Sequence, residues 1–277
     1  MPPPNDLTKI TANLLFHMRP CAIKKKFGQH FLFDAKINRK IVSLAGDLRD
    51  KVVVEVGPGP GGLTLEILKQ AVKKVILVEI DSHWCNVWNN LGAQFDRKVE
   101  ILEQDALLCD YKSISPDVII SNLPYNISVP LLCKWLTELN TFENLILMFQ
   151  KEVADRLCTQ PATKAYGKLS VMVQHLVKIE KIFEVEPGSF LPAPKVKSTV
   201  IKITPHLNPR VWSDSFLTLL THAFAYRRKT VAKTLTKFIK NPEQTLRDLG
   251  YDANARAEEI SVEDYAKLHH LCFNDTA

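Results

Sequence analysis

Short apolar runs alternate with amphipathic stretches over the first three quarters of the chain. The runs are rich in valine, isoleucine and leucine and are apolar along most of their length, which is typical of strands buried on both faces of a parallel sheet. They occupy residues 51–56, 75–81, 99–106, 117–121, 145–149, 181–185 and 198–203. Helical patterns separate most of them. They occupy residues 34–45, 128–138, 152–157 and 169–177, and another begins near residue 63. This alternation predicts an α/β fold with a doubly wound parallel sheet.

The pattern changes after residue 204. A linker bounded by two prolines, residues 205–209, is followed by helical patterns only, at residues 213–226, 229–239 and 243–249 and after the N-cap Ser261. Glu263 and Asp264 would occupy the first turn of that last helix, where negative charge is favourable. We therefore predict a first domain at residues 1–204 and a smaller, all-helical domain at residues 205–277.

Composition excludes several classes of protein. No apolar run approaches the roughly 18 residues that a membrane span needs, and no basic segment leads into an apolar one at the N-terminus, as in a secretory signal. Three prolines at residues 2–4 and Asp6 argue against an amphipathic mitochondrial transit helix. The six cysteines are scattered without a CxxC pair, which favours neither a zinc site nor a disulfide framework. We expect a cytoplasmic protein without a metal site.

The positive charge is concentrated in two stretches. The chain has a net charge of +6 and a pI of about 8.9. Residues 19–40 contain seven lysines and arginines against one acid, Asp34, and residues 222–240 contain six against none. Stretches of this kind favour a phosphate-rich partner such as RNA. The alternative is that they are solvated faces of ordinary helices.

A glycine-rich turn follows the first predicted strand. Residues 57–62 read Gly-Pro-Gly-Pro-Gly-Gly and lead into a helix, an arrangement that lets a ligand approach the backbone closely. Glu79 comes about twenty residues later at the end of the next strand, where a carboxylate can bind two ribose hydroxyls. Asp105 ends the third strand and can accept a hydrogen bond from an adenine amine. The turn alone is shared by NAD enzymes and methyltransferases, and each acid could be a solvated strand-end residue.

A second motif follows the strand at residues 117–121. Asn122-Leu123-Pro124-Tyr125 offers an amide oxygen and a backbone carbonyl that can both accept hydrogen bonds from an exocyclic amine. The tyrosine ring offers a flat face for stacking a base. The simpler interpretation is an ordinary Asn/Pro turn at a strand end. A proline-containing loop at residues 190–196 is expected near the mouth of the same site.

Seven short segments together carry a resemblance to a known family. They lie at residues 27–32, 55–59, 78–81, 104–106, 122–128, 190–198 and, in loose form, 222–229. In these segments the chain resembles the KsgA-type ribosomal RNA small-subunit adenine N6,N6-dimethyltransferase family, from about Lys24 to the last helix. The resemblance implies a Rossmann-like class I methyltransferase domain at residues 1–204 and a helical RNA-binding domain at residues 205–277.

The resemblance also implies a cofactor, S-adenosylmethionine, and the residues that contact it. The residues that match the family's cofactor contacts are His30, Leu32, Gly57, Gly59, Glu79, Asp105 and Asn122. Gly57 and Gly59 would lie beneath the methionine moiety, and Asn122 near the methyl group. The proline-rich form of the turn is compatible with this role, because Pro58 and Pro60 require only a fixed negative φ.

The predicted reaction depends on orientation. We expect Asn122 and Pro124 to accept the two hydrogens of an adenine N6 amine and so direct its lone pair at the methyl group. Tyr125, and Phe190 by resemblance, would stack on the flipped base, with the Tyr125 ring rather than its hydroxyl carrying the effect.

The predicted substrate is two adjacent adenines near the 3′ end of small-subunit (16S) rRNA in an assembling subunit. A monomer is expected. RNA phosphates would contact the basic stretches Lys24–Lys26 and Arg227–Lys240, in which Arg227, Arg228 and Lys229 are the predicted substrate-binding residues.

Three alternatives remain at the level of sequence. A large-subunit rRNA adenine dimethyltransferase of the antibiotic-resistance type shares the core motifs, and the basic segment at residues 227–229 and the helical tail argue for the small subunit. A non-enzymatic nucleic-acid-binding relative is disfavoured by the intact motif at residues 122–125 and by Glu79 and Asp105. An NAD oxidoreductase is suggested only by the glycine turn and Glu79.

Overall fold

The chain forms two compact units in the computed structural model, which describes residues 30–92, 95, 98–138, 142–208, 210–226 and 229–273. One unit comprises Met1–Lys151 and Glu180–Thr204, and the other comprises Glu152–Ile179 and Pro205–Ala277. The division near residue 204 agrees with the sequence pattern. Residues 152–179, however, belong to the helical unit and not to the first domain.

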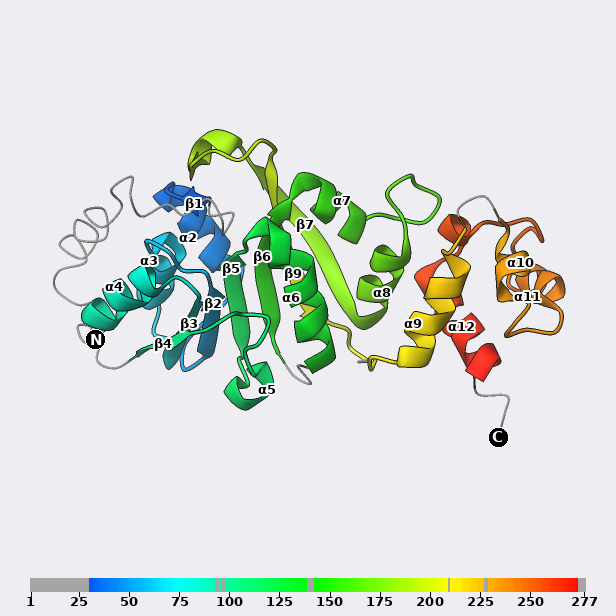
Figure 1. Ribbon diagram of the computed structural model, residues 1–277, viewed down its shortest axis with the longest axis horizontal. Helices are drawn as coiled ribbons and strands as arrows, with labels where there is room; N and C mark the ends of the chain where they lie inside the picture. Colours follow the sequence, from blue (N-terminus) through cyan, green and yellow to red (C-terminus); the bar gives the residue numbers. More distant parts are fainter. Residues whose placement is uncertain are drawn as a thin grey trace. The chain divides into compact units, whose positions relative to one another are not determined.

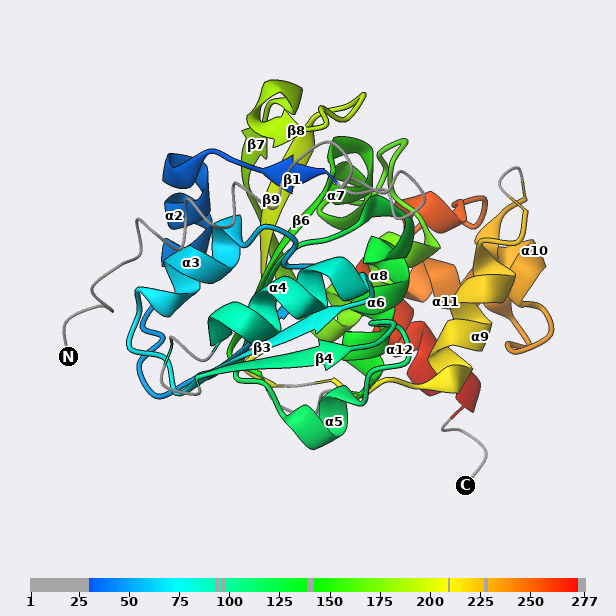
Figure 2. The same cartoon turned by 60° about the vertical axis from the view of Figure 1, so that its left-hand side comes forward.

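The first unit is built on a seven-stranded sheet with the order β4-β3-β2-β5-β6-β9-β7 (Figure 1). Its strands are β2 (Val52–Val56), β3 (Lys74–Glu79), β4 (Val99–Glu103), β5 (Val118–Asn122), β6 (Asn144–Gln150), β7 (Val177–Val185) and β9 (Ser198–Pro205). The pairs from β4 through β6 are all parallel. The predicted runs of apolar residues thus correspond to strands of one sheet. Figure 2 shows this sheet with β3 and β4 in front.

The prediction of an entirely parallel sheet is wrong at one strand. β9 pairs with β6 in the antiparallel sense, from Leu145 opposite Ile203 to Gln150 opposite Ser198. A strand that runs parallel to its neighbour is usually reached through a crossover helix. Between β7 and β9 the chain contains only a 3-10 turn, Pro187–Ser189, and a two-residue strand, β8 (Phe190–Leu191).

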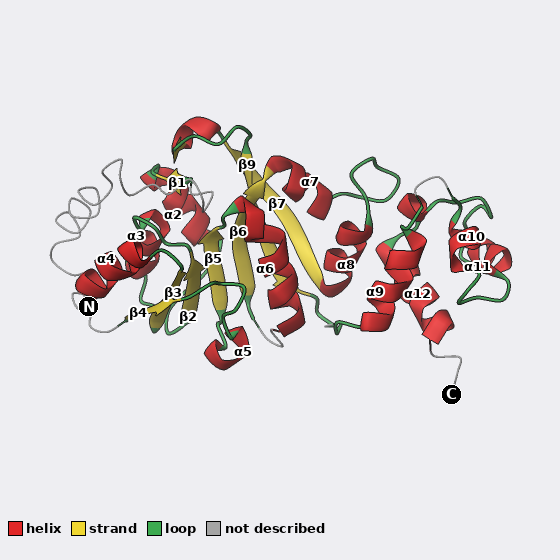
Figure 3. Cartoon of the chain, viewed as in Figure 1, coloured by secondary structure: helices red, strands yellow, loops and turns green. Residues whose placement is uncertain are grey.

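Helices α2 (Ala35–Ser43), α3 (Gly62–Leu68), α4 (Ser82–Gly92), α5 (Tyr111–Ile114) and α6 (Tyr125–Glu138) connect the strands, as the secondary-structure colouring shows (Figure 3). Asp34 is confirmed as the N-cap of α2, because its Oδ1 accepts hydrogen bonds from the backbone N–H groups of Lys36 and Ile37. Trp84 and Trp88 of α4 are fully buried in a core with the valines and leucines of β2 and β3. Trp88 also contacts the glycine turn between β2 and α3, so α4 packs against that turn.

A small two-stranded sheet was not predicted from the sequence. β1 (Phe31–Leu32) pairs with β8 in the antiparallel sense, with Phe31 opposite Leu191 and Leu32 opposite Phe190. The pairing joins two segments that lie about 160 residues apart in the chain, and it places both of them beside the glycine turn and the end of β5.

The second unit is helical. Its helices are α7 (Lys151–Leu157), α8 (Lys168–Leu176), α9 (Asp214–Ala223), α10 (Val231–Leu235), α11 (Pro242–Asp248) and α12 (Val262–Phe273), with a 3-10 turn at Ala257–Glu259. The buried face of α8 packs against α9 and α12, which explains why residues 152–179 belong to this unit. Ser261 accepts a hydrogen bond from the backbone N–H of Asp264, as predicted for an N-cap. No helix in the described ranges is long and apolar enough to cross a membrane.

Candidate active site

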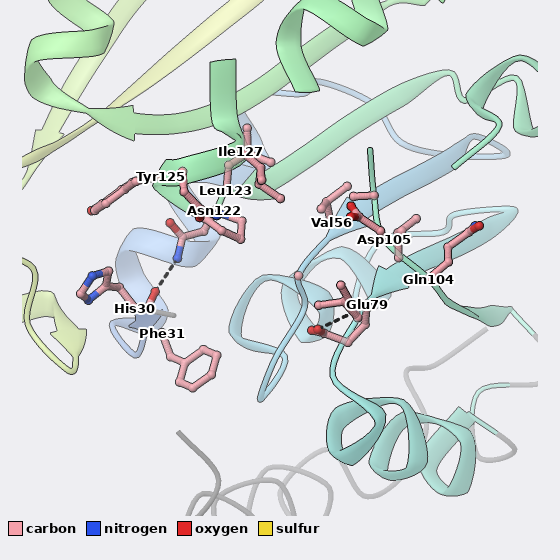
Figure 4. Close-up of a pocket in the computed structure, with 16 residues that line it drawn as sticks. His30, Phe31, Val56, Glu79, Gln104, Asp105, Asn122, Leu123, Tyr125 and Ile127 are labelled. Atoms are coloured by element: carbon pink, nitrogen blue, oxygen red, sulfur yellow. Dashed lines mark hydrogen bonds between the residues drawn. The ribbon is translucent and has the colours of Figure 1, made fainter. Parts of the chain in front are cut away.

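A cleft opens at the carboxyl ends of β2, β3, β4 and β5 (Figure 4). The carboxyl ends of parallel strands meet at one edge of a sheet, and this edge is where α/β proteins bind ligands. The residues lining the cleft are His30, Phe31, Val56, Gly57, Val78, Glu79, Ile80, Gln104, Asp105, Ala106, Asn122, Leu123, Pro124, Tyr125, Asn126 and Ile127. Most of the predicted site residues are therefore neighbours in space.

Glu79 is held firmly at the end of β3. Its side chain is 5% exposed, and Oε1 accepts hydrogen bonds of 2.9 Å from the backbone N–H groups of Ile80 and Asp81. Oε2 accepts a longer one, 3.4 Å, from the N–H of Gly59. Burial raises the pKa of Glu79, against the opposing effect of these N–H donors. The carboxyl group thus has a fixed orientation and links β3 to the glycine turn.

Asp105 lies beyond the end of β4, on the same side of the cleft as Glu79 (Figure 4). Its Oδ1 accepts a 2.8 Å hydrogen bond from the backbone N–H of Leu107. Ile80 and Gln104 also line this part of the cleft, and sequence reasoning assigned them no role. Ile80 is 48% exposed although it is a large apolar residue, so it offers an apolar surface to the cleft. The sequence did offer a signal for this exposed residue: Ile80 stands between two acids, Glu79 and Asp81, directly after a buried strand.

The glycine turn is shaped by the packing around it. Gly57, with φ +67°, lines the cleft, whereas Gly59, with φ +48°, lies behind Phe31. A Cβ atom on Gly59 would lie 2.4 Å from Cε1 of Phe31. The backbone carbonyl of Gly59 accepts a 2.8 Å hydrogen bond from Nε1 of Trp88 and so points away from the cleft. Gly59 therefore shapes the turn, and it is absent from the cleft lining.

Glu55 lies beneath this turn, on β2. It is 2% exposed, and its Oε2 accepts a 2.6 Å hydrogen bond from the Thr64 hydroxyl. Burial raises the pKa of Glu55 from 4.5 to about 8, so the carboxyl group is mainly protonated at neutral pH. The sequence contained Glu55 within a motif but carried no indication that it would be neutral.

Glu55→Gln should make the stability of the protein less dependent on pH. In the wild type the folded state binds the Glu55 proton between the unfolded pKa near 4.5 and the folded pKa near 8, so unfolding releases it and stability falls as pH rises through this window. The slope is at most about 1.4 kcal/mol per pH unit. Glutamine keeps the neutral shape and cannot ionise. Urea unfolding of both proteins from pH 5 to 8 should give a free-energy difference that grows with pH; parallel curves would contradict the assignment.

Asn122, the last residue of β5, has a fixed amide. Its Nδ2 donates a 2.8 Å hydrogen bond to the backbone carbonyl of His30, shown as a dashed line in Figure 4. A carbonyl oxygen can only accept, so the atom of the Asn122 amide that faces it is the nitrogen. The amide oxygen, Oδ1, has no hydrogen-bond partner among the described residues. The carbonyl of Pro124 accepts a 3.1 Å hydrogen bond from the N–H of Ile127 and retains a second lone pair. Both acceptors that the sequence suggested are therefore present.

The Tyr125 ring is half-buried at the other end of the cleft. Its centroid lies 5.4 Å from that of the His30 ring, at an interplanar angle of 30°. Figure 4 shows both rings on the side away from Glu79 and Asp105. His30, predicted as a cofactor contact, thus places its ring beside the predicted base-stacking residue. Burial raises the pKa of the Tyr125 hydroxyl, which keeps it neutral.

Besides Gly59, two predicted contacts lie behind the wall of the cleft. Phe190 is 5% exposed and belongs to the hydrophobic core, so its ring is not available to stack on a base in this structure, contrary to the prediction. Leu32 is also 5% exposed, and its carbonyl accepts a hydrogen bond from Nδ2 of Asn38. The cause is the β1–β8 pairing, which turns both side chains into the core.

The predicted RNA contacts are only partly visible. Arg227, Arg228 and the residues Lys24–Lys26 lie outside the described residues. Lys229 is exposed in the helical unit, with its Nζ 4.2 Å from the centroid of the Tyr226 ring, which is itself 59% exposed. A cation beside an exposed aromatic face suits contact with RNA.

Comparison with known proteins identifies the family. Residues 21–272 match the family described as Ribosomal RNA adenine dimethylase. The chain belongs to this family. The match covers both compact units, and it rules out the NAD oxidoreductase alternative.

Individual relatives agree with this assignment. The "Ribosomal RNA small subunit methyltransferase A" of Anaplasma phagocytophilum is 44% identical over 250 residues, which cover 88% of this chain and 93% of the relative. The protein of the same name from Rhodospirillum rubrum is 40% identical over 249 residues, or 88% and 86% of the two chains.

Solved structures show the same fold. A dimethyladenosine transferase from Plasmodium falciparum has a TM-score of 0.76 at 28% identity and covers 89% of this chain and 98% of its own. The 23S rRNA methyltransferase ErmE has a TM-score of 0.70 at 22% identity, over 87% of this chain and 99% of its own, which supports the fold alone. The predicted Rossmann-like methyltransferase fold with a helical C-terminal region is confirmed.

The cofactor of this methyltransferase is S-adenosylmethionine, and the cleft fits it. A fixed carboxylate at the end of β3 suits a pair of ribose hydroxyls, and a second at the end of β4 suits an adenine amine. Ile80, an exposed apolar residue in the lining, offers a surface that suits an adenine ring. The described part of the chain gathers no group of three or more His, Cys, Asp or Glu side chains that could hold a metal ion.

Proposed function

We propose that this methyltransferase adds two methyl groups to N6 of each of two adjacent adenines near the 3′ end of small-subunit rRNA. The observation that carries the proposal is the amide of Asn122, whose nitrogen is held by His30 and whose oxygen is left as an acceptor in the cleft that Pro124 also lines. The choice of the small subunit rests on relatives of that name at about 40% identity over most of the chain. The substrate proposed is an assembling small subunit in the cytoplasm, and the active form is a monomer.

Asn122 and Pro124 act on the amine of the target adenine. The lone pair of this amine is delocalised into the ring, so the free base is a poor nucleophile. Oδ1 of Asn122 and the carbonyl of Pro124 accept its two hydrogens, which draws the nitrogen toward tetrahedral geometry and localises the lone pair. Bound S-adenosylmethionine supplies an electrophilic methyl group on its sulfonium. The two acceptors are fixed before the substrate arrives, so no reorganisation is needed during the reaction.

No side chain at this end of the cleft has to act as a general base. The phenol of Tyr125 is hydrogen-bonded and has a raised pKa, which makes it a poor base at neutral pH. The methylated nitrogen is itself acidic and can release its proton to water. After the first transfer one hydrogen remains on the nitrogen, so one of the two acceptors is sufficient to orient it for the second.

Glu79→Gln should weaken binding of S-adenosylmethionine about tenfold to a hundredfold, because a charge-assisted pair of hydrogen bonds to the ribose is worth roughly 1.5–3 kcal/mol. Isothermal titration calorimetry gives the affinity directly. Glu103→Gln is the matched control: Glu103 lies opposite Glu79 in the β3–β4 pair and does not line the cleft. Equal affinities for the wild type and the Glu79 variant would remove Glu79 from the ribose site.

The function is tested by mass spectrometry of ribosomal RNA after incubation with the protein and S-adenosylmethionine. Unmodified small subunits, free 16S rRNA and free 23S rRNA are offered separately. We expect dimethyladenosine at two adjacent positions near the 3′ end of the small-subunit RNA, with the particle preferred over the free RNA. Dimethyladenosine confined to 23S rRNA would instead establish the large-subunit alternative, and no methylation would establish the non-enzymatic one.

A further inference from the structure

The hydroxyl of Tyr125 has a partner far away in the sequence. It lies 2.6 Å from the hydroxyl of Ser198, within the first unit. The same stretch of chain also holds His30, whose Nδ1 donates a 2.8 Å hydrogen bond to the backbone carbonyl of Pro192. Both aromatic side chains at this end of the cleft are therefore tied to the segment of residues 190–198.

Ser198 is a rigid anchor. It is fully buried, and it is the first residue of β9, where it pairs with Gln150 of β6. On its other side β6 pairs with β5, and there Asn122 of β5 lies opposite Met148 of β6. The hydroxyl of Ser198 is thus fixed by the same sheet that fixes the amide of Asn122, two strands away.

A hydrogen bond to the hydroxyl of a tyrosine restricts the orientation of its ring. The ring direction depends on two side-chain torsions, and packing near Cβ leaves the far end free to move. A hydrogen bond at the hydroxyl fixes the far end, and hence both torsions. The His30 ring limits the tilt further, because it packs on Tyr125 at 30° and is itself held through Pro192.

We infer that Ser198 is a positioning residue for methyl transfer, which sets the plane of the Tyr125 ring against which the target adenine stacks. The inference rests on the proposed function and assigns the Tyr125 hydroxyl a role that the sequence did not suggest. Ser198 touches neither the base nor the cofactor. Its effect passes through the ring, and a small tilt of the base moves its amine away from the acceptors of Asn122 and Pro124.

The test compares Ser198→Ala, Tyr125→Phe and the double variant. Each single variant removes one partner of the same hydrogen bond. The matched control is Thr199→Val, because Thr199 is fully buried next to Ser198 and its hydroxyl has no partner among the described residues. Valine keeps its shape. The substrate is a mixture of unmodified small subunits and free 23S rRNA, so that the variants are compared on whichever adenine the wild type methylates.

Ser198→Ala and Tyr125→Phe should each lower kcat about tenfold, since a small misplacement of a reacting group costs one to two orders of magnitude. The double variant should be no slower than either one, because both remove the same contact. Affinity for S-adenosylmethionine in calorimetry should remain at the wild-type value, and Thr199→Val should change neither this affinity nor kcat. The unfolding temperature of each single variant should fall only by the small amount expected for one lost hydrogen bond.

Several results would overturn the inference. A wild-type kcat for Ser198→Ala would do so, as would losses that multiply in the double variant, or an equal loss in Thr199→Val. A loss of cofactor affinity together with kcat would mark Ser198 as merely structural. If Ser198→Ala does not fold, Tyr125→Phe tests the same bond. Methylation of the wrong RNA by the wild type would refute the proposed substrate and leave the comparison among variants intact.

Discussion

Asn122→Ala should lower kcat about 10²- to 10³-fold, the loss typical of removing one preorganised group that stabilises a transition state. Two defects combine in this variant. The amide oxygen that accepts an amine hydrogen disappears, and the bond from Nδ2 to the carbonyl of His30 is lost. Single-turnover methylation of small-subunit RNA measures the first defect. Affinity for S-adenosylmethionine should change much less, because Glu79 and Asp105 remain in place.

Asn144→Ala separates catalysis from stability. Asn144 also donates from Nδ2 to a backbone carbonyl, that of Ala45 at 3.1 Å, and its buried Oδ1 likewise has no partner among the described residues. It begins β6 and does not line the cleft. We expect it to lower the unfolding temperature at least as much as Asn122→Ala while kcat stays at the wild-type value. A comparable loss of kcat in the two variants would mean that Asn122 acts only through the fold.

Gly61→Ala should destabilise the protein by about 2–5 kcal/mol, the sum of a left-handed backbone strain and an overpacked core. Gly61 has φ +83°, and a Cβ atom there would lie 2.1 Å from Cζ2 of Trp88. Trp88 cannot move away cheaply, because it is fully buried and its Nε1 donates to the carbonyl of Gly59. Urea unfolding measures the loss.

Gly46→Ala is the control for the backbone term. Gly46 has nearly the same φ, +81°, and a Cβ atom added there would have nothing within 4 Å. Its cost should be only about 1–2 kcal/mol, the left-handed strain alone. The combination of Gly61→Ala with Trp88→Leu should cost less than the sum of the two single changes, because the ring that meets the new methyl group is gone. Equal losses for Gly61→Ala and Gly46→Ala would refute the steric argument.

The positions of Glu79, Asp105 and Asn122 around one cleft could be predicted because these residues follow the order of the strands in the sheet. Glu79, Asp105 and Asn122 each come at the end of an apolar run, and the carboxyl ends of parallel strands meet by geometry. The acceptors of the Asn122–Tyr125 motif could be predicted for the same reason. The direction in which the Asn122 amide faces could not, since it depends on a carbonyl ninety-two residues away.

The rest of the site depends on long-range contacts without a sequence pattern. Two-residue strands such as β1 and β8 have no measurable period, so the burial of Leu32 and Phe190 was not foreseeable. The neutral state of Glu55 arises from burial on all sides, which a strand sequence does not reveal. The placement of residues 152–179 in the helical unit depends on which surface α8 packs against, and its sequence is equally compatible with either unit.

The pairing of β1 with β8, and of Tyr125 with Ser198, sets an order in which the site can be completed during synthesis. Glu79, Asp105 and Asn122 all leave the ribosome within one stretch of chain, so the nucleoside end of the cleft can form on an unfinished protein. The ring of Tyr125 gains its anchor only after Ser198 has emerged. A nascent chain can therefore form the nucleoside end of the cleft first, and the orientation of the Tyr125 ring is fixed only once β9 has joined the sheet.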